Sequence, residues 1–166
     1  MADSTKLGAT DRRLLEVLQR DGRRPYAELG ADVGISGPSA HERVKKLEAR
    51  RVIRGYSATV DPAAAGFTIL AFCWITQAPG TIATDLTGDF ASIAEIEECH
   101  HIAGEADYLL KIRVRDTLGL ERVIHRLQVN SQVNSTETVV VLSSAFERRP
   151  LPAPPGSGET DGPAEA

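Results

Sequence analysis

Residues 34–51 read GISGPSAHERVKKLEARR, which predicts a tight turn followed by a basic amphipathic helix. At 100° per residue, Ala40, Val44 and Leu47 fall on one apolar stripe of that helix. Ser36 is placed to cap the helix, and Pro38 is tolerated within its first turn. We therefore expect one face of the helix to pack and the polar face to be free to enter a groove of DNA.

Two shorter helices are predicted just upstream of this segment. The first is expected to begin at Thr10 as N-cap and to stop at Gly22, and the second to follow Pro25 and end at Gly34. Their apolar faces are formed by Leu14, Leu15 and Leu18 in the first helix and by Leu29 and Val33 in the second. After the third helix, residues 52–60 alternate loosely and predict a short strand or wing. Together these elements predict a helix-turn-helix domain over residues 10–60, which is a winged one if residues 52–60 form the wing. A flexible arm at 1–9 is expected before it and a linker at 61–66 after it.

Charge is distributed unevenly along the chain. The 166 residues carry a net charge of −4, but residues 1–56 hold 12 Lys/Arg and 8 Asp/Glu, whereas residues 57–166 hold 7 and 15. A basic N-terminal part with an acidic remainder is typical of a phosphate-contacting module joined to a domain with a different role. The two cysteines, Cys73 and Cys99, give no disulfide framework. With no signal-peptide pattern and no apolar run long enough to span a bilayer, we expect a cytoplasmic protein without membrane association.

A second unit is predicted from residue 67 onward. Strands are expected over 67–77, 93–103, 107–115 and 137–146, with a turn at 104–106. One helix, carrying Ile82, Leu86 and Phe90, is expected between the first two strands, and another, capped by Thr117, before the last. The order βαββαβ is that of a ferredoxin-like sandwich over residues 67–149, so the whole chain is predicted to be α+β. The Pro-rich residues 150–166 are expected to be a disordered tail.

The first strand of the second unit has no clearly polar face. Phe72 and Trp74 lie on the face opposite Ala71 and Cys73, and helices can cover only one of the two. Because exposed apolar patches usually mark interfaces, the pattern predicts a homodimer that forms by sheet-to-sheet contact. The alternative is that the linker or the tail of the same chain folds over that face.

The whole arrangement resembles the Lrp/AsnC (leucine-responsive, or feast/famine) family of transcriptional regulators. The segments that carry the resemblance are TDRRLL at 10–15, ELGADVGIS at 28–36, RVKKLE at 43–48, VIRGY at 52–56, ECH at 98–100 and AGEADYLLK at 103–111. The resemblance implies that the second unit is a RAM domain, that the chain dimerises and assembles further, often into octamers, and that it responds to an amino acid or similar small effector.

By the same resemblance, the effector is expected near the hairpin. The candidate effector-binding residues are Gly104, Glu105, Asp107 and Tyr108. A glycine turn exposes backbone N–H groups to a carboxylate, and an acidic side chain can meet an ammonium group. The alternative is that residues 104–106 are only a turn.

The chain departs from the family pattern at two positions. Gly30 stands where a better helix former is usual, so the second helix is expected to be loosened. Glu105 stands where a shorter acidic residue is common.

The third helix supplies the candidate DNA contacts. Phosphate contacts are assigned to Lys45, Lys46 and Arg50. Base contacts are assigned to the groove-entering end of the helix, namely to Ser36, Pro38, Ser39, His41, Glu42 and Arg43. Arg43 is expected either to reach a guanine or to pair with Glu42 or Glu48 and only brace the helix. A twofold dimer implies double-stranded DNA with a pseudo-palindromic operator.

Two other classes of protein compete with this interpretation. The first is a metal-sensing winged-helix repressor with ligands among Cys99, His100 and His101. Adjacent strand residues point to opposite faces, so only Cys99 and His101 can share one, and we predict no metal site. The second is an enzyme, for which the fold alone gives no support. The chain has no phosphate-cradling glycine motif and no nucleophile–base spacing, so neither catalysis nor a cofactor is expected.

Overall fold

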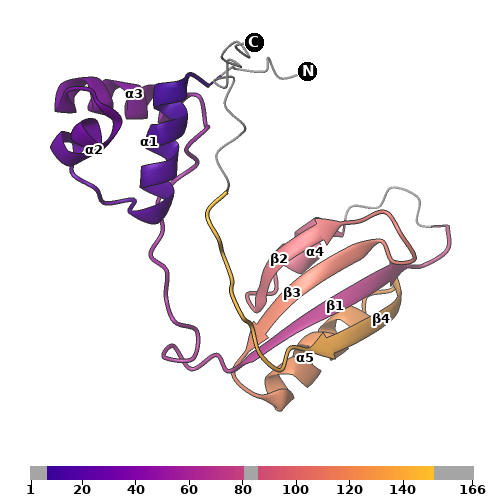
Figure 1. The fold of residues 1–166 in the computed structure, drawn as a ribbon. Helices are drawn as coiled ribbons and strands as arrows, with labels where there is room; N and C mark the ends of the chain where they lie inside the picture. The colour runs from indigo at the N-terminus through magenta and orange to yellow at the C-terminus, as the bar shows by residue number, and fades with distance from the viewer. Residues whose placement is uncertain (1–6, 81–85, 152–166) are drawn as a thin grey trace, which may run out of the picture. The chain divides into compact units, whose positions relative to one another are not determined.

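The computed structural model describes residues 7–80 and 86–151, which form two units (Figure 1). The first unit contains the described residues up to Ala58 together with those from Phe146 onward, and the second is Thr59–Ala145. The domain bounds expected from the sequence, 10–60 and 67–149, stay a prediction, and in the structure residues 146–149 group with the helical unit.

The first unit is built from three helices, α1 (Ala9–Arg20), α2 (Tyr26–Val33) and α3 (Gly37–Ala49). Each helix contributes buried side chains to a small shared core, as the apolar periodicity predicts. The fully or nearly fully buried core residues are Leu14 from α1, Leu29 and Val33 from α2, and Ala40 and Val44 from α3. The predicted stripe of α3, including Leu47, is therefore confirmed as its packing face.

Helix ends follow the predicted chemistry in α2 and α3 but not at the start of α1. Gly34 ends α2 in the left-handed conformation with φ 76°, and the Ser36 side chain accepts a hydrogen bond from the Ser39 N–H at the start of α3. In contrast, α1 begins one residue before Thr10, with Gly8 as N-cap and no side-chain cap. Thr10 is therefore a helical residue, whereas the other end agrees with the prediction, since the helix ends at Arg20 with Asp21 as C-cap directly before Gly22.

Gly30 does not loosen α2, contrary to our expectation. It is buried, and its carbonyl accepts a 2.8 Å hydrogen bond from the Ile35 N–H. A Cβ at this position would lie 2.7 Å from the Ile35 oxygen and 2.9 Å from the Ser36 carbonyl carbon. Only glycine therefore allows the turn between α2 and α3 to lie directly on α2.

The predicted strand or wing over residues 52–60 is not formed. The chain leaves α3 through two backbone hydrogen bonds to the Leu47 carbonyl, from Val52 at 2.9 Å and from Ile53 at 3.2 Å. The Tyr56 hydroxyl then donates to Glu48 at 2.9 Å. An extended segment becomes a strand only when a neighbour pairs with it, and no described segment of this unit does so.

The second unit is a four-stranded antiparallel sheet in the order β2-β3-β1-β4, as the βαββαβ pattern predicts (Figure 1). Its elements are β1 (Ile69–Gln77), α4 (Thr87–Ala91), β2 (Ile96–His101), β3 (Tyr108–Val114), α5 (Thr117–Gln128) and β4 (Val133–Val140). Alternate residues of β1 and β3 form one core with residues from α4 and α5, so both helices cover the same face of the sheet. The opposite face of the sheet, which we call the open face, has no described helix packed on it.

Several boundaries in this unit differ from the sequence-based ones. Strand β4 spans 133–140 rather than 137–146 because its antiparallel register with β1 pairs Gln77 with Val133 and Ala71 with Val140. The N-cap of α5 is Asp116, whose carboxylate accepts the Gly119 N–H at 2.7 Å, so Thr117 is already helical. Strands β1 and β2 are shorter than predicted. The predicted helical position Ile82 lies outside the described residues.

Candidate nucleic-acid interface and effector site

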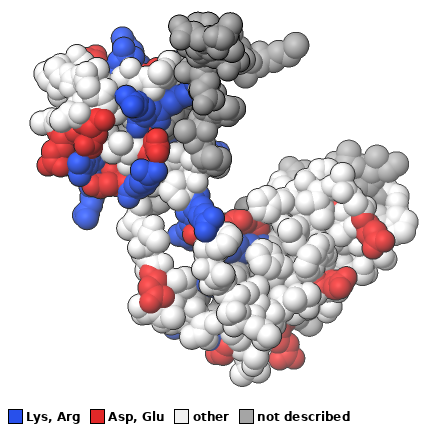
Figure 2. All heavy atoms as spheres, viewed as in Figure 1, with Lys and Arg blue, Asp and Glu red and all other residues white. Residues whose placement is uncertain are grey.

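The polar face of α3 borders a hollow of about 420 Å³. Its lining combines cations, one carboxylate, one hydroxyl group and two apolar side chains from α3 and its C-cap with one carboxylate from α1. The lining residues are Asp11, Pro38, Ser39, Glu42, Arg43, Lys46, Leu47 and Arg50. Figure 2 shows Lys and Arg side chains on the visible face of the helical unit, with acidic side chains between them. Most of the predicted DNA-contacting residues are thus brought together on one concave surface.

Arg43 is held by a carboxylate that the sequence did not identify as its partner. Its Nη1 lies 3.0 Å from Oδ1 of Asp11 on α1. The Asp11 side chain is 16% exposed and that of Arg43 is 46% exposed. A guanidinium carries five N–H donors, so this contact orients Arg43 and leaves further donors directed to solvent. The alternative partners Glu42 and Glu48 take no described hydrogen bond from it, and Glu48 instead accepts one from Tyr56.

Ser36, His41 and Lys45, the predicted contacts that do not line the hollow, differ in their surroundings. Ser36 is occupied by capping, since its hydroxyl oxygen accepts the Ser39 N–H at 3.3 Å and its hydroxyl group pairs with that of Ser39 at 2.9 Å. The His41 ring packs on Tyr26 of α2 with 4.6 Å between ring centroids. Lys45 is exposed but does not line the hollow, unlike Lys46 and Arg50.

The four predicted effector residues differ in their exposure and in the contacts they already make. Gly104 and Glu105 are exposed in the loop between β2 and β3. Asp107 is half-buried, and its carboxylate accepts the Gln77 N–H at 2.7 Å, which ties the loop to the end of β1. Tyr108 is only 5% exposed. Its ring packs edge-on against Phe90 at 5.5 Å and stacks on His101 at 4.9 Å. The loop is therefore open, and the two residues after it fix its position.

The open face of the sheet is apolar along β1. Phe72 and Trp74 are half-buried within the described chain, and Leu70 is nearly buried. Across the sheet, Trp74 pairs with Leu109 of β3, and Phe72 pairs with the 48% exposed Val139 of β4. The pattern predicted from the first strand thus extends over three strands.

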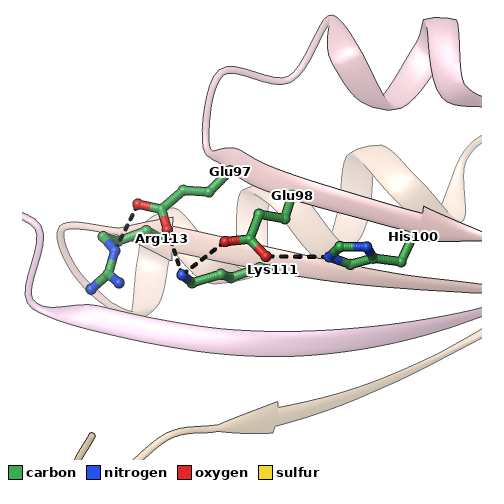
Figure 3. Close-up of polar contacts among 5 residues, drawn as sticks. All are labelled: Glu97, Glu98, His100, Lys111 and Arg113. Atoms are coloured by element: carbon green, nitrogen blue, oxygen red, sulfur yellow. Dashed lines mark hydrogen bonds and ion pairs between the residues drawn. The ribbon is translucent and has the colours of Figure 1, made fainter. Parts of the chain in front are cut away.

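Charged residues of β2 and β3 form a network beside this apolar strip (Figure 3). Lys111 is only 7% exposed, and its Nζ lies 3.4 Å from Glu97 and 3.1 Å from Glu98. Arg113 Nε donates to Glu97 at 2.7 Å, and His100 Nε2 lies 3.2 Å from Glu98. The carboxylate partners of Lys111 and Arg113 could not be predicted from the sequence, because they depend on how β2 aligns with β3.

The same network affects the ionisation of Glu98. Partial burial raises the pKa of this carboxyl, but hydrogen bonds from Lys111 and His100 outweigh it and hold the pKa below its ordinary value. The carboxylate is therefore the favoured form of Glu98 beside the Lys111 ammonium group.

The residues considered for a metal site do not converge. His100 pairs with Glu98, the His101 ring stacks on Tyr108, and Cys99 packs against the core. Within residues 7–80 and 86–151 no three His, Cys, Asp or Glu side chains gather closely enough to hold a metal ion. The described geometry thus gives no support to the metal-sensing alternative.

Comparison with known proteins identifies both units. An AsnC-type helix-turn-helix domain matches residues 7–48, and an Lrp/AsnC ligand-binding domain matches residues 70–151. The chain belongs to the Lrp/AsnC family. It is thus a transcriptional regulator with a DNA-binding and a ligand-binding domain. None of the helices in the described ranges is long and apolar enough to cross a membrane.

Individual Lrp/AsnC members match along nearly their whole length. The transcriptional regulator LrpA of Mycobacterium tuberculosis is 33% identical, with 86% of this chain and 95% of the relative covered. The leucine-responsive regulatory protein of Klebsiella pneumoniae is 38% identical, with 91% and 97% covered. Among solved structures, the feast or famine regulatory protein from M. tuberculosis complexed with L-methionine superposes with a TM-score of 0.84 at 33% identity, covering 90% of this chain and all of that one.

Proposed function

We propose that α3 enters the major groove of an operator with the hollow along its polar face turned toward the DNA. The observation that carries this proposal is the concave surface on which Arg43, Lys46 and Arg50 converge. Lys45, Lys46 and Arg50 contact phosphates, which supply affinity without sequence preference. Base contacts come from the N-terminal half of the helix, with Arg43 directed by Asp11 toward a base edge.

Residues at the start of α3 complete the base-reading set. Besides Arg43 it comprises Ser36, Pro38, Ser39, His41 and Glu42, with Ser36 acting mainly through the helix cap. His41 is held by the Tyr26 ring, so its imidazole is presented at a fixed position.

Salt dependence of operator binding tests this division of roles. Lys46→Ala should weaken binding to matched and mismatched operators equally and flatten the slope of log K against log salt by about one unit. Arg43→Ala should instead reduce the preference for the matched operator by about 1–3 kcal/mol at one base pair. Arg20→Ala, which removes an equally charged but distant and exposed side chain, is the control. Identical behaviour of the Lys46 and Arg43 variants would refute the assignment.

We also propose that the open face joins two copies of the chain into a homodimer, which reads a pseudo-palindromic operator and assembles further. Support comes from the apolar strip of Phe72, Trp74 and Val139, which the described part of the chain leaves partly exposed. Trp74→Glu should convert the dimer to monomer in analytical ultracentrifugation. Leu118→Glu places the same charge at a 63% exposed site on α5 and should leave the dimer intact. A monomeric unmodified chain at micromolar concentration would exclude the proposal.

The effector of this regulator is proposed to be an amino acid bound at the loop between β2 and β3. Two solved relatives carry L-methionine, from M. tuberculosis and from Neisseria meningitidis. Gly104 and Glu105 are the exposed contacts, and Asp107 and Tyr108 hold the loop. We propose that the protein acts on DNA in the cytoplasm, without catalytic activity and without a cofactor.

A thermal-shift screen against the twenty amino acids tests the effector site. A ligand that binds the native state raises the unfolding midpoint, and Glu105→Gln should reduce that shift if its carboxylate meets the ammonium group. Glu121→Gln, an exposed carboxylate on α5, is the matched control. A shift that survives in Glu105→Gln and in Gly104→Val alike would place the ligand elsewhere.

A further inference from the structure

The chain returns to its DNA-binding unit after completing the sheet. Strand β4 ends at Val140, yet the described residues from Phe146 onward group with the three helices and not with the sheet. We call residues 146–151 the return segment. The segment is short, and its three apolar residues, Phe146, Pro150 and Leu151, are all exposed, so its position needs an explanation other than burial of apolar surface.

One side chain of α1 holds the return segment by its backbone. The Leu151 N–H donates to Gln19 Oε1 at 2.7 Å, and Gln19 Nε2 donates to the Leu151 carbonyl at 3.4 Å. The Gln19 side-chain amide thus pairs with both the N–H and the carbonyl of Leu151, as the backbone of a neighbouring strand would. The Leu151 side chain is 75% exposed, so the contact depends on the backbone and not on the identity of the residue.

The return segment is also shaped before it reaches Gln19. Arg148 adopts a positive φ of 53°, which turns the chain. The Arg149 guanidinium lies over the Phe146 ring, 4.0 Å from its centroid. These local contacts reduce the freedom of the segment and so lower the entropy cost of docking it on α1.

Docking joins the two units at two points of the chain. Residues 59–68 lead into β1, and residues 142–145 lead from the sheet back to the return segment. A domain on one linker is free to reorient, whereas a second short connection removes many of those orientations. We propose that the return segment is an intramolecular strap whose docking on α1, through Gln19, restricts the orientation of the DNA-binding unit. Its consequence for half-site spacing rests on the DNA-binding homodimer proposed above.

Hydrogen exchange in the full-length chain tests docking without DNA. The Leu151 N–H should exchange at least about tenfold more slowly in the unmodified chain than in Gln19→Ala, because it is hydrogen-bonded in the native state. Leu151→Pro removes the donor and should release the segment, whereas Leu151→Ala keeps the backbone and should retain docking. Release in every variant is read from the {1H}-15N heteronuclear NOE of the Phe146 and Arg149 amides, which all variants keep and which falls when the segment becomes mobile. Gln19 is exposed, and an unchanged circular dichroism spectrum confirms that its variants fold.

Operator binding then tests the consequence of the strap. Against operators that differ only in half-site spacing, the unmodified chain and Leu151→Ala should favour one spacing, and Gln19→Ala and Leu151→Pro should bind several spacings within about twofold of each other. An unprotected Leu151 amide in the unmodified chain would overturn the strap and leave the proposed DNA binding standing. Failure to bind any operator would overturn DNA binding, while protection would still support docking. Protection lost on dilution to monomer would show that the segment comes from a second copy and overturn the intramolecular assignment.

Discussion

Replacing Gly30 with alanine should destabilise the DNA-binding unit, although alanine is the better helix former. In an open helical position, glycine to alanine gains up to about 1 kcal/mol. Here the added Cβ would lie 2.7, 2.9 and 3.0 Å from three backbone atoms of residues 35–37. Backbone atoms at a tight turn cannot move aside as a flexible side chain would, and such overpacking typically costs about 1–3 kcal/mol. Subtracting the propensity gain from the middle of this range leaves a net loss of about 1 kcal/mol, or a fall of about 4–8 °C in the Tm of a domain of this size.

The two units can be followed separately in one chain. The single tryptophan, Trp74, lies on β1 and reports unfolding of the second unit, whereas ellipticity at 222 nm also reports the three helices of the first. Gly30→Ala should lower the midpoint seen at 222 nm and leave the Trp74 midpoint unchanged. A Cβ added at Gly88 in α4 would meet no described neighbouring segment within 4 Å, so Gly88→Ala should be neutral or stabilising. A Gly30→Ala variant as stable as the unmodified chain would refute the close-approach argument.

Three further perturbations follow from the described contacts. Ser36→Ala removes the cap of α3 and should cost about 1 kcal/mol in urea unfolding followed at 222 nm, so an unchanged midpoint would contradict the capping role. A double-mutant cycle with Asp11→Asn and Arg43→Gln should give a coupling energy of at most about 1 kcal/mol in the same assay, because Arg43 is half-exposed. The ionised Glu98 stabilises the fold above its ordinary pKa of 4.5, and this stability is lost as the pH falls through its lowered folded-state pKa. The unfolding midpoint followed by Trp74 fluorescence should therefore fall less steeply with decreasing pH in Glu98→Gln than in the unmodified chain.

Features that depend on residues close in the sequence were predicted well. The stripe of Ala40, Val44 and Leu47, the Ser36 cap and the αL end of α2 at Gly34 each follow from side-chain spacing or backbone conformation within one or two helical turns. Burial of alternate residues of β3, namely Tyr108, Leu110, Ile112 and Val114, likewise follows the two-residue period of a strand. The fold class followed from the order of such elements.

Features set by pairing between distant segments were not predicted. Residues 141–146 have the composition of a strand, yet β4 ends at Val140 because the register with β1 starts at Val133. Residues 52–60 alternate as a strand should but have no neighbour to pair with in the described unit. Gly30 was misjudged for the same reason, since its helix propensity is local and its contact with the following turn is not.

Arg43 shows most clearly how tertiary contact changes the interpretation of a candidate site. From the sequence its role was divided between reading a base and bracing the helix through Glu42 or Glu48. The structure places its guanidinium against Asp11, a residue of a different helix, and both line the same hollow. Bracing and reading are then not alternatives, because a carboxylate that holds one edge of the guanidinium reduces the side-chain entropy lost when the other edge meets a base. In this family member, α1 therefore contributes to the proposed DNA-contacting surface as well as to the core beneath it.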